Sequence, residues 1–344
     1  MHSMTRHVAL PLAVVALMAL SGCPGSKSQP PPMATGPGAT DASSAAGQAG
    51  QTDQDEWTIG MSQCNLGEPW RVQMNKDIEQ AADEHPELDV IFKDAQNKTE
   101  QQQAQVREFI AQGVDLIIIS PKEAVPLTKP VGEAMDAGIP VIVLDRKIEG
   151  DRYTCFIGGD NVLIGREAGK YMVELLGGKG KVVELRGLET STPADERHQG
   201  FIEGIAGSDI DIIFDPDCEW LEPKAQREMN SALARFDQID AVYGHNDPSA
   251  HGAYQAAKQE GRDRQEAIRF IGIDALPHEG VKYVQEGILD ATLQYPTGGA
   301  QAIDIALRIL GGEDVPKSIT LGTRLFTADN VADGGKEILA QDDE

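Results

Sequence analysis

Short runs of apolar, mostly β-branched residues alternate along this chain with longer segments of helical periodicity. The run LIIIS (116–120) is apolar on both faces, which is typical of a parallel strand buried between two layers of helices. The pattern predicts strands at 57–62, 88–94, 116–120, 139–145, 153–160, 181–187, 209–215, 241–247, 268–274 and 288–296. It predicts helices at 69–85, 99–112, 124–137, 162–176, 194–206, 223–236 and 249–260.

This regular alternation predicts an α/β fold with right-handed crossovers and helices on both faces of the sheet. The rhythm breaks at Gly158-Gly159-Asp160 and then starts again. We therefore expect two doubly wound parallel-sheet lobes rather than one very wide sheet. The length of 344 residues agrees, because it favours about two domains.

Polar residues stand where four of the predicted strands end. In an open α/β sheet, ligands bind in the crevice beyond the carboxyl ends of the strands, so these side chains predict a ligand cleft. Asp145 with Arg146 could instead be a structural ion pair that closes a strand. The residues concerned are Asp145 and Arg146, Asn246 and Asp247, Asp274, and Gln294.

Planar, bidentate groups of this kind suit the neighbouring hydroxyl groups of a sugar, whose C–H faces pack on aromatic rings. Trp70, beside Arg71, and Trp220 lie near strand ends, and Arg197 lies at the start of a predicted helix. Each also has a simpler interpretation. The two tryptophans could be partial core packing, and the arginine could be a solvated surface charge.

The N-terminus predicts export. Residues 8–20 form an apolar stretch that is short for a membrane span and fits the hydrophobic region of a signal peptide at 1–22. The sequence LSGC, ending at Cys23, resembles a lipobox and implies lipidation of that cysteine; an ordinary secretory signal is the alternative. Residues 23–56 are rich in Pro, Gly, Ser, Ala and Gln, and we expect a flexible tether.

Acidic residues dominate the charge, with 55 Asp and Glu against 30 Lys and Arg, a formal net charge of −25. Phosphate binding needs a basic stripe, and none is present, so we expect no nucleic-acid partner. The excess predicts a solvated acidic surface.

Signals for enzymes and metals are weak. The sequence contains no His-Glu-x-x-His, no Gly-x-Ser-x-Gly and no phosphate-binding Gly-Lys-Ser/Thr loop, so we expect no catalytic residue and no cofactor. Cys64, Cys155 and Cys218 match no zinc spacing, and we expect no metal site. Because these cysteines are three, at least one is free even if a disulfide forms.

Residues 57–329 resemble the periplasmic sugar-binding proteins of ABC transporters. The likeness is to the ribose-binding type and, closer still, to the galactofuranose-binding branch. It rests on GMSQ…PWR (60–71), QGVDLIIISP (112–121), IPVIVLDR (139–146), GDN (159–161), ADERHQGF (194–201), GHND (244–247), IGID (271–274) and ATLQY (291–295).

The resemblance implies the type I periplasmic binding protein fold, in which three chain crossings form a hinge between the lobes. The crossings are expected near Gly159, near Gln294 and at 320–323, and a helix at about 298–311 returns to the first lobe. The implied parts are an N-terminal lobe of 57–159 plus 295–320, a C-terminal lobe of 160–294 plus 321–330, and an acidic tail of 331–344.

The resemblance also assigns roles to the polar strand ends. It implies that Trp70 and Trp220 lie against the sugar ring, while Arg71 matches the galactofuranose branch. Ser120 stands where the ribose type has an asparagine. The residues implied to hydrogen-bond the sugar are Asp145, Arg146, Arg197, Asn246, Asp274 and Gln294.

The function implied is that of a monomeric, lipid-anchored substrate-binding protein of an ABC sugar importer in the cell envelope. It would close its lobes around a pentose or hexose, furanose forms included, and present the closed form to a membrane permease. A sugar sensor that presents its closed form to a receptor kinase or chemoreceptor is the alternative. A secreted glycosidase is a third possibility, with Asp145 and Asp274 as formal candidates for its two carboxylates.

Overall fold

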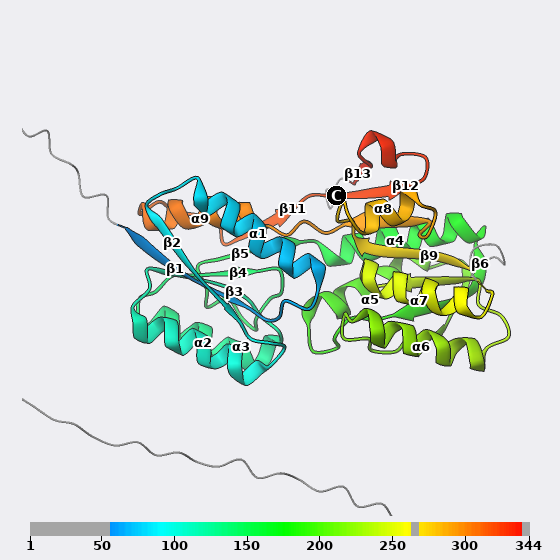
Figure 1. The fold of residues 1–344 in the computed structure, drawn as a ribbon, viewed down its shortest axis with the longest axis horizontal. Helices are drawn as coiled ribbons and strands as arrows, with labels where there is room; N and C mark the ends of the chain where they lie inside the picture. Colours follow the sequence, from blue (N-terminus) through cyan, green and yellow to red (C-terminus); the bar gives the residue numbers. More distant parts are fainter. Residues whose placement is uncertain (1–55, 263–267, 339–344) are drawn as a thin grey trace, which may run out of the picture. The chain divides into compact units, whose positions relative to one another are not determined.

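The computed structural model describes residues 56–262 and 268–338 (Figure 1). The predicted signal peptide, the tether up to residue 55 and the lipidation of Cys23 lie outside the described residues. The strand and helix signals of the sequence correspond closely to the elements of the structure.

The first lobe is built on a six-stranded, all-parallel sheet in the order β11-β5-β4-β3-β1-β2. Helices α1 and α9 pack together on one side of this sheet, and α2 and α3 pack together on the other (Figure 1). The strands are β1 (Trp57–Gln63), β2 (Leu88–Asp94), β3 (Leu116–Ser120), β4 (Val141–Leu144), β5 (Cys155–Gly159) and β11 (Ser318–Leu321). The helices are α1 (Pro69–Asp83), α2 (Thr99–Gln112), α3 (Ala124–Asp136) and α9 (Gly299–Leu310).

Strand β3 shows why its sequence is apolar at successive positions. Leu116 and Ile118 belong to the core cluster that contains residues of α1 and α9, whereas Ile117 and Ile119 belong to the cluster that contains residues of α2 and α3. Side chains alternate between the two faces of a strand, so a strand covered on both faces needs apolar residues throughout.

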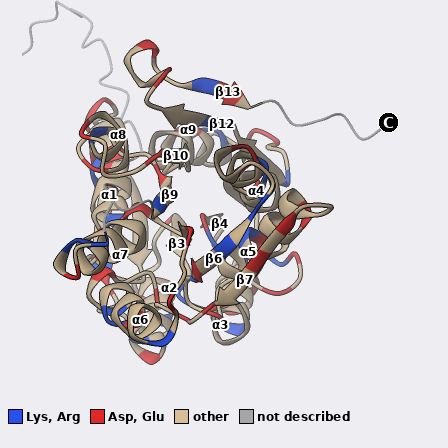
Figure 2. Cartoon of the chain, turned by 90° about the vertical axis from the view of Figure 1, so that its right-hand side faces the viewer, with Lys and Arg blue, Asp and Glu red and all other residues tan. Residues whose placement is uncertain are grey.

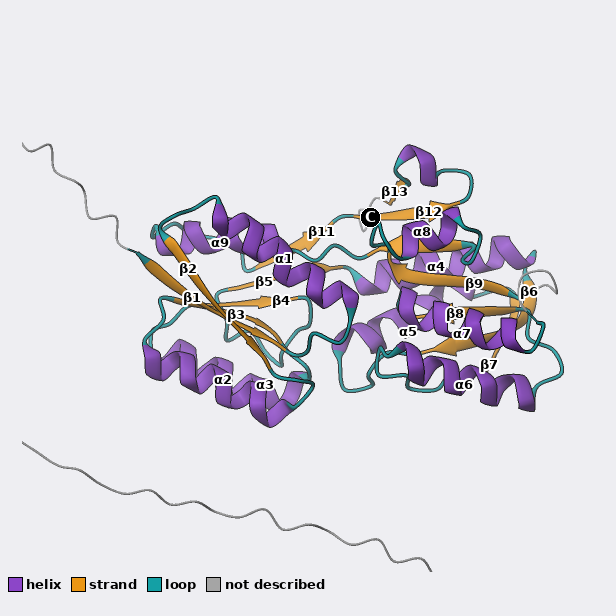
Figure 3. Cartoon of the chain, in the orientation of Figure 1, coloured by secondary structure: helices purple, strands orange, loops and turns teal. Residues whose placement is uncertain are grey.

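The second lobe is built on a seven-stranded sheet in the order β13-β12-β10-β9-β8-β6-β7 (Figure 3). Strands β6 to β10 run parallel, and β12 pairs antiparallel with both β10 and β13. The strands are β6 (Lys179–Leu185), β7 (Asp209–Phe214), β8 (Ala241–Gly244), β9 (Arg269–Asp274), β10 (Ala291–Gln294), β12 (Thr323–Thr327) and β13 (Lys336–Ile338). The helices are α4 (Asn161–Leu176), α5 (Thr192–Ile205), α6 (Glu222–Arg235), α7 (Asp247–Gln259) and α8 (Gly280–Gln285).

The chain passes between the two sheets three times. The crossings lie at Asp160 between β5 and α4, at 295–298 between β10 and α9, and at Gly322 between β11 and β12. A two-lobed α/β fold with a three-crossing hinge was the prediction, and the topology confirms it.

The C-terminal segment differs from the expected acidic tail. Residues 331–333 form a 3-10 helix, and 336–338 form β13 on the edge of the second sheet. Three residues held by backbone pairing carry too little side-chain periodicity to be recognised in a sequence. The sequence analysis also missed helix α8 and strands β11 and β12, which are only 6, 4 and 5 residues long.

Acidic and basic residues are intermixed over the helices and strands of the side shown in Figure 2. The cysteines Cys64, Cys155 and Cys218 are all buried and free in the described part of the chain. Among residues 56–262 and 268–338, no helix has both the length and the apolar character that a membrane crossing requires.

Candidate ligand-binding site

A cavity lies where the carboxyl ends of the strands of both sheets meet. Its lining comes from both lobes, with β4 and α1 on one side and β8, β9 and α5 on the other. All the predicted ligand-binding residues line it except Gln294. The lining consists of Glu68, Trp70, Arg71, Asp145, Arg146, Pro193, Arg197, Trp220, Asn246, Asp274 and Tyr295.

Arg71 is the centre of a buried network in the first lobe. Its side chain is only 2% exposed, and one guanidinium nitrogen donates to Asp145 Oδ2 at 3.1 Å. Its Nε donates to Glu68 Oε1 at 3.2 Å, and Nη1 donates to Ser120 Oγ at 2.9 Å and to Gln63 Oε1 at 3.1 Å. Each of the three guanidinium nitrogens thus has at least one acceptor, which fixes the Arg71 and Asp145 side chains at the cavity wall.

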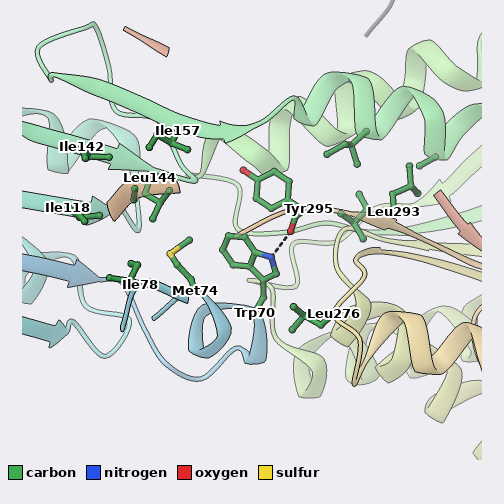
Figure 4. Close-up of a cluster of buried hydrophobic side chains, with 14 of the residues drawn as sticks. Trp70, Met74, Ile78, Ile118, Ile142, Leu144, Ile157, Leu276, Leu293 and Tyr295 are labelled. Atoms are coloured by element: carbon green, nitrogen blue, oxygen red, sulfur yellow. Dashed lines mark hydrogen bonds between the residues drawn. The ribbon is translucent and has the colours of Figure 1, made fainter. Parts of the chain in front are cut away.

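Trp70 and Tyr295 form the aromatic side of the cavity, next to the second crossing between the lobes. Trp70 Nε1 donates to the backbone oxygen of Tyr295 at 2.8 Å, as the dashed line in Figure 4 shows. The two ring centroids are 5.3 Å apart. Tyr295 Oη donates to the backbone oxygen of Asp145 at 3.2 Å, so both hydrogen bonds tie the crossing segment to the first lobe.

Trp220 lies between two guanidinium groups. The Arg146 guanidinium lies 5.4 Å from its ring centroid, and that of Arg197 lies 5.3 Å from it. Its indole Nε1 is buried and has no hydrogen-bond partner among the described residues. A buried indole donor normally has a hydrogen-bond partner, so its absence here needs an explanation.

Arg197 lies in the first turns of α5 and is 3% exposed. Its Nε donates to Asn161 Oδ1 at 2.9 Å, its Nη1 donates to the backbone oxygen of His245, and its guanidinium lies 4.7 Å from the ring centroid of Tyr295. The interpretation of Arg197 as a solvated surface charge is therefore wrong.

Asn246 caps helix α7 and contacts the cavity at the same time. Its Oδ1 accepts from Ser249 N at 3.1 Å, and its Nδ2 donates to the backbone oxygen of Trp220 at 3.1 Å. Behind it, His245 Nε2 lies 2.8 Å from Glu184 Oε1, and His245 Nδ1 accepts from Gly187 N at 3.2 Å. Burial lowers the pKa of His245, so a neutral imidazole accepts at Nδ1 and donates at Nε2.

Asp274 ends β9 and differs from Asp145. Its side chain lines the cavity and is nearly buried, and its carboxyl group has no hydrogen-bond partner among the described residues. Burial raises its pKa well above the ordinary value, although Arg197 opposes the shift. The residue has a φ of 127°, a strained backbone conformation that surrounding contacts must enforce.

Gln294 does not line the cavity; it ends β10, and its backbone oxygen accepts from Thr323 Oγ1 at 2.5 Å. Its neighbour Tyr295 occupies the wall instead. Glu68, Pro193 and Tyr295 were not predicted, although Tyr295 ends the motif ATLQY, and Glu68 and Pro193 directly precede PWR and ADERHQGF. Within the described ranges, His, Cys, Asp and Glu side chains nowhere gather into a group of three able to hold a metal ion.

Comparisons with known proteins agree with this architecture. The family model described as "Periplasmic binding protein domain" matches residues 59–314. The ribose import binding protein of Bacillus subtilis is 31% identical over 277 residues, which are 80% of this chain and 88% of that protein. The galactofuranose-binding protein of Escherichia coli is 32% identical over 273 residues, which are 77% of this chain and 85% of that protein.

Among solved structures, the fructose-binding periplasmic domain of a hybrid two-component system is 44% identical, with a TM-score of 0.78. That match covers 81% of this chain and 93% of the other. A galactofuranose-binding protein is 30% identical, with a TM-score of 0.77, over 80% of this chain and 96% of the other. With its fold, its motifs and these matches, the chain belongs to the periplasmic binding protein family, among the sugar-binding proteins of the ribose type.

Proposed function

We propose that this protein captures one neutral monosaccharide between its two lobes and delivers it to an ABC permease. The observation that carries the proposal is the cavity, which is lined by hydrogen-bonding and aromatic side chains from both lobes. A ligand that contacts both lobes stabilises the closed form over an open one, so closure reports capture to the permease.

The charges of the cavity support a neutral ligand. Three guanidinium groups, of Arg71, Arg146 and Arg197, stand against three carboxyl groups, of Glu68, Asp145 and Asp274. A charged sugar derivative would leave an uncompensated buried charge, which is costly. The eleven lining residues include three aromatic rings, which suit the apolar C–H faces of a sugar.

A binding role is favoured over hydrolysis. Asp145 accepts hydrogen bonds from Arg71 and from Ser120 Oγ at 3.2 Å, so its carboxylate is engaged in holding the site together. The relatives named above are solute-binding proteins. Release of reducing sugar from glycoside substrates by the purified protein would contradict this view.

The ligand itself is tested by titration calorimetry. The panel begins with D-fructose, because the structure with 44% identity is a fructose-binding domain, and includes D-ribose, D-galactose, L-arabinose and myo-inositol. We expect at least one sugar to bind with a Kd of about 1 μM, or roughly −8 kcal/mol. Absence of binding across the panel by a folded sample would contradict sugar capture.

Membrane attachment through lipidated Cys23 and a monomeric state belong to the same proposal. Expression of the full chain in a bacterial host with labelled palmitate should label the wild type and leave Cys23→Ser unlabelled. Equal labelling of both proteins would contradict the assignment of the anchor. Size-exclusion chromatography with light scattering should give the mass of one chain.

A sugar sensor is the second candidate, because the fructose-binding structure is part of a two-component signalling protein. The two roles differ in the partner that recognises the closed lobes. Deletion of the gene should abolish uptake of radiolabelled ligand if the protein serves an importer. Normal uptake, together with loss of a sugar-induced transcriptional response, would favour the sensor.

A further inference from the structure

Asp247 lies directly behind the cavity without lining it. It is the first residue of α7 and is fully buried. Its Oδ2 accepts from the backbone amide of Ala275 at 2.8 Å, and its Oδ1 accepts from Thr292 Oγ1 at 2.6 Å. One carboxyl group therefore joins α7 to β10 and to the residue that follows β9.

Two glycines, Gly272 and Gly280, leave space for the Asp247 carboxyl group. A methyl group added to Gly272 would lie 2.3 Å from Asp247 Oδ1, and one added to Gly280 would lie 1.9 Å from Oδ2. Only glycine at these two positions leaves room for the Asp247 side chain. The contact thus depends on residues of three separate segments: β9, α7 and the start of α8.

The amide that Asp247 accepts from belongs to a strained turn. Asp274 has a φ of 127°, and Ala275 has a φ of 52°. Backbone strain of this kind persists only where surrounding contacts enforce it. The hydrogen bond from the Ala275 amide to Asp247 is such a contact, and the strained turn is what places the unpartnered Asp274 carboxyl group in the cavity.

We propose that Asp247 is a positioning residue for sugar binding, which holds the Asp274 carboxyl group in the cavity and makes sugar capture release a proton. The proposal rests on the function proposed above. It assigns a binding role to a residue that does not touch the ligand.

The electrostatics of the pair support proton release. Burial raises the pKa of Asp247, and the charge of Glu279 raises it further. The hydrogen bonds from Thr292 and the Ala275 amide and the charge of Arg197 lower it. Burial also raises the pKa of Asp274, where Arg197 opposes the shift while Asp247, Glu279 and Glu68 add to it. Asp274 directly precedes Ala275, whose amide bonds Asp247, and two buried carboxyl groups linked in this way resist carrying two charges, so the empty pair retains a proton near neutral pH.

Sugar affinity should depend on pH through Asp274. Sugar hydroxyl groups that donate to Asp274 favour its ionised form, so its pKa is lower in the complex than in the empty site. Binding therefore releases a proton wherever the empty site still holds one, and affinity rises with pH over that range. Replacement of Asp247 by Asn removes one negative charge beside Asp274, which moves the rise to lower pH.

The test uses the tightest-binding sugar of the panel with full-length wild type, D247A and D247N. D247A loses the bond to the Ala275 amide, and we expect affinity to fall roughly tenfold or more. D247N keeps an acceptor for that amide while Thr292 turns to accept from the new NH₂ group, so it should recover most of the affinity. Circular dichroism confirms that each variant is folded.

Calorimetry at each pH over about 5 to 8, in two buffers that both work at that pH but differ in ionisation enthalpy, counts the protons exchanged on binding. The wild type should release a proton, and the affinity profile of D247N should shift toward lower pH. D290N is the matched control, because Asp290 is also buried and accepts a β9 amide, that of Phe270 at 2.9 Å, at the opposite end of the sheet. Its profile should be unchanged.

The outcomes separate the two proposals. If the wild type binds no sugar, the proposed function fails before Asp247 is tested. If the wild type binds sugar but D247A binds equally well, or D247N keeps the pH profile of the wild type, the role of Asp247 is overturned and the proposed function stands.

Discussion

The ammonium group of Lys147 lies 2.7 Å from the Glu196 carboxylate, and this ion pair joins the first lobe to the second beside the cavity. The other oxygen of Glu196 accepts from Asn161 Nδ2 at 3.3 Å, and Asn161 Oδ1 accepts from Arg197 Nε at 2.9 Å. A contact made only when the lobes approach is thereby connected to a residue of the cavity wall. The pair should stabilise the closed form.

Replacement of Lys147 by Ala should weaken sugar binding roughly two- to fivefold, because the pair is partly exposed and such pairs contribute modestly. The loss should appear in the dissociation rate and shrink in high salt, as screening weakens the wild-type pair. Stopped-flow fluorescence at low and high salt measures both. Lys170→Ala removes an ion pair of equal length within α4 and should leave sugar binding unchanged. Equal losses of affinity in both variants would contradict the role of the Lys147–Glu196 pair in stabilising the closed form.

Gly187 leaves room for Trp220. A methyl group at position 187 would lie 2.2 Å from Trp220 Cζ2, so Gly187→Ala must displace the indole from between Arg146 and Arg197. We expect sugar affinity to fall roughly tenfold, in keeping with the cost of overpacking a filled site. Titration calorimetry measures the loss.

Gly311→Ala is the control for this substitution, because the added methyl group meets only carbonyl oxygens of its own helix. It should bind sugar as the wild type does. Unchanged affinity in Gly187→Ala would show that Trp220 does not contact the ligand.

Arg71 should matter for stability as well as for binding. Replacement by Met leaves the buried Glu68 carboxyl group without its cation and leaves Asp145 with only Arg146, whose Nε is 3.8 Å away. This should cost about 3–5 kcal/mol of the free energy of unfolding. Urea unfolding of the sugar-free protein measures this. The exposed pair of Arg107 and Glu133 provides the comparison, and Arg107→Met should cost less than about 1 kcal/mol.

Acid should destabilise the second lobe through Glu184. Burial by itself raises the pKa of this carboxyl group, but hydrogen bonds from His198 and His245 outweigh burial and lower it to about 2. Because the folded-state pKa lies below the unfolded one, the stabilisation is complete above about pH 5 and is lost as pH falls toward 2. The loss is on the order of 3 kcal/mol.

Glu184→Gln should therefore show a flatter decline in the free energy of unfolding between about pH 5 and 3 than the wild type. The bond to Glu184 raises the pKa of His198 and places its titration above this range, whereas His245, whose pKa burial lowers, gains its proton at lower pH in both proteins. Parallel curves for the two proteins would count against the role of Glu184. The ion pair of Arg71 and Asp145 lies in the first lobe, so it should contribute equally to the unfolding curves of the wild type and Glu184→Gln.

Much of the fold could be read from local patterns. The apolar run from Leu116 to Ser120 predicted a parallel strand covered on both faces, and all five residues are buried in β3. Asn246 and Asp274 could be assigned to one site because they follow neighbouring parallel strands, whereas Asp145 belongs to the other sheet and was placed with them by the family resemblance. Local patterns could not choose between Gln294 and Tyr295, since a turn of one residue at the strand end decides which side chain faces the cavity.

The sequence by itself determined the two-lobed α/β architecture and the chemistry of the site, because strand periodicity and residue type at strand ends are local properties. Only the tertiary structure decided which groups are satisfied before a ligand arrives. Arg71 finds acceptors on β1, β3 and the end of β4, whereas the Asp274 carboxyl group finds none among the described residues and lies in front of Asp247. Such partnerships join residues far apart in the chain, and no local pattern encodes them, because they depend on how the sheets and helices pack.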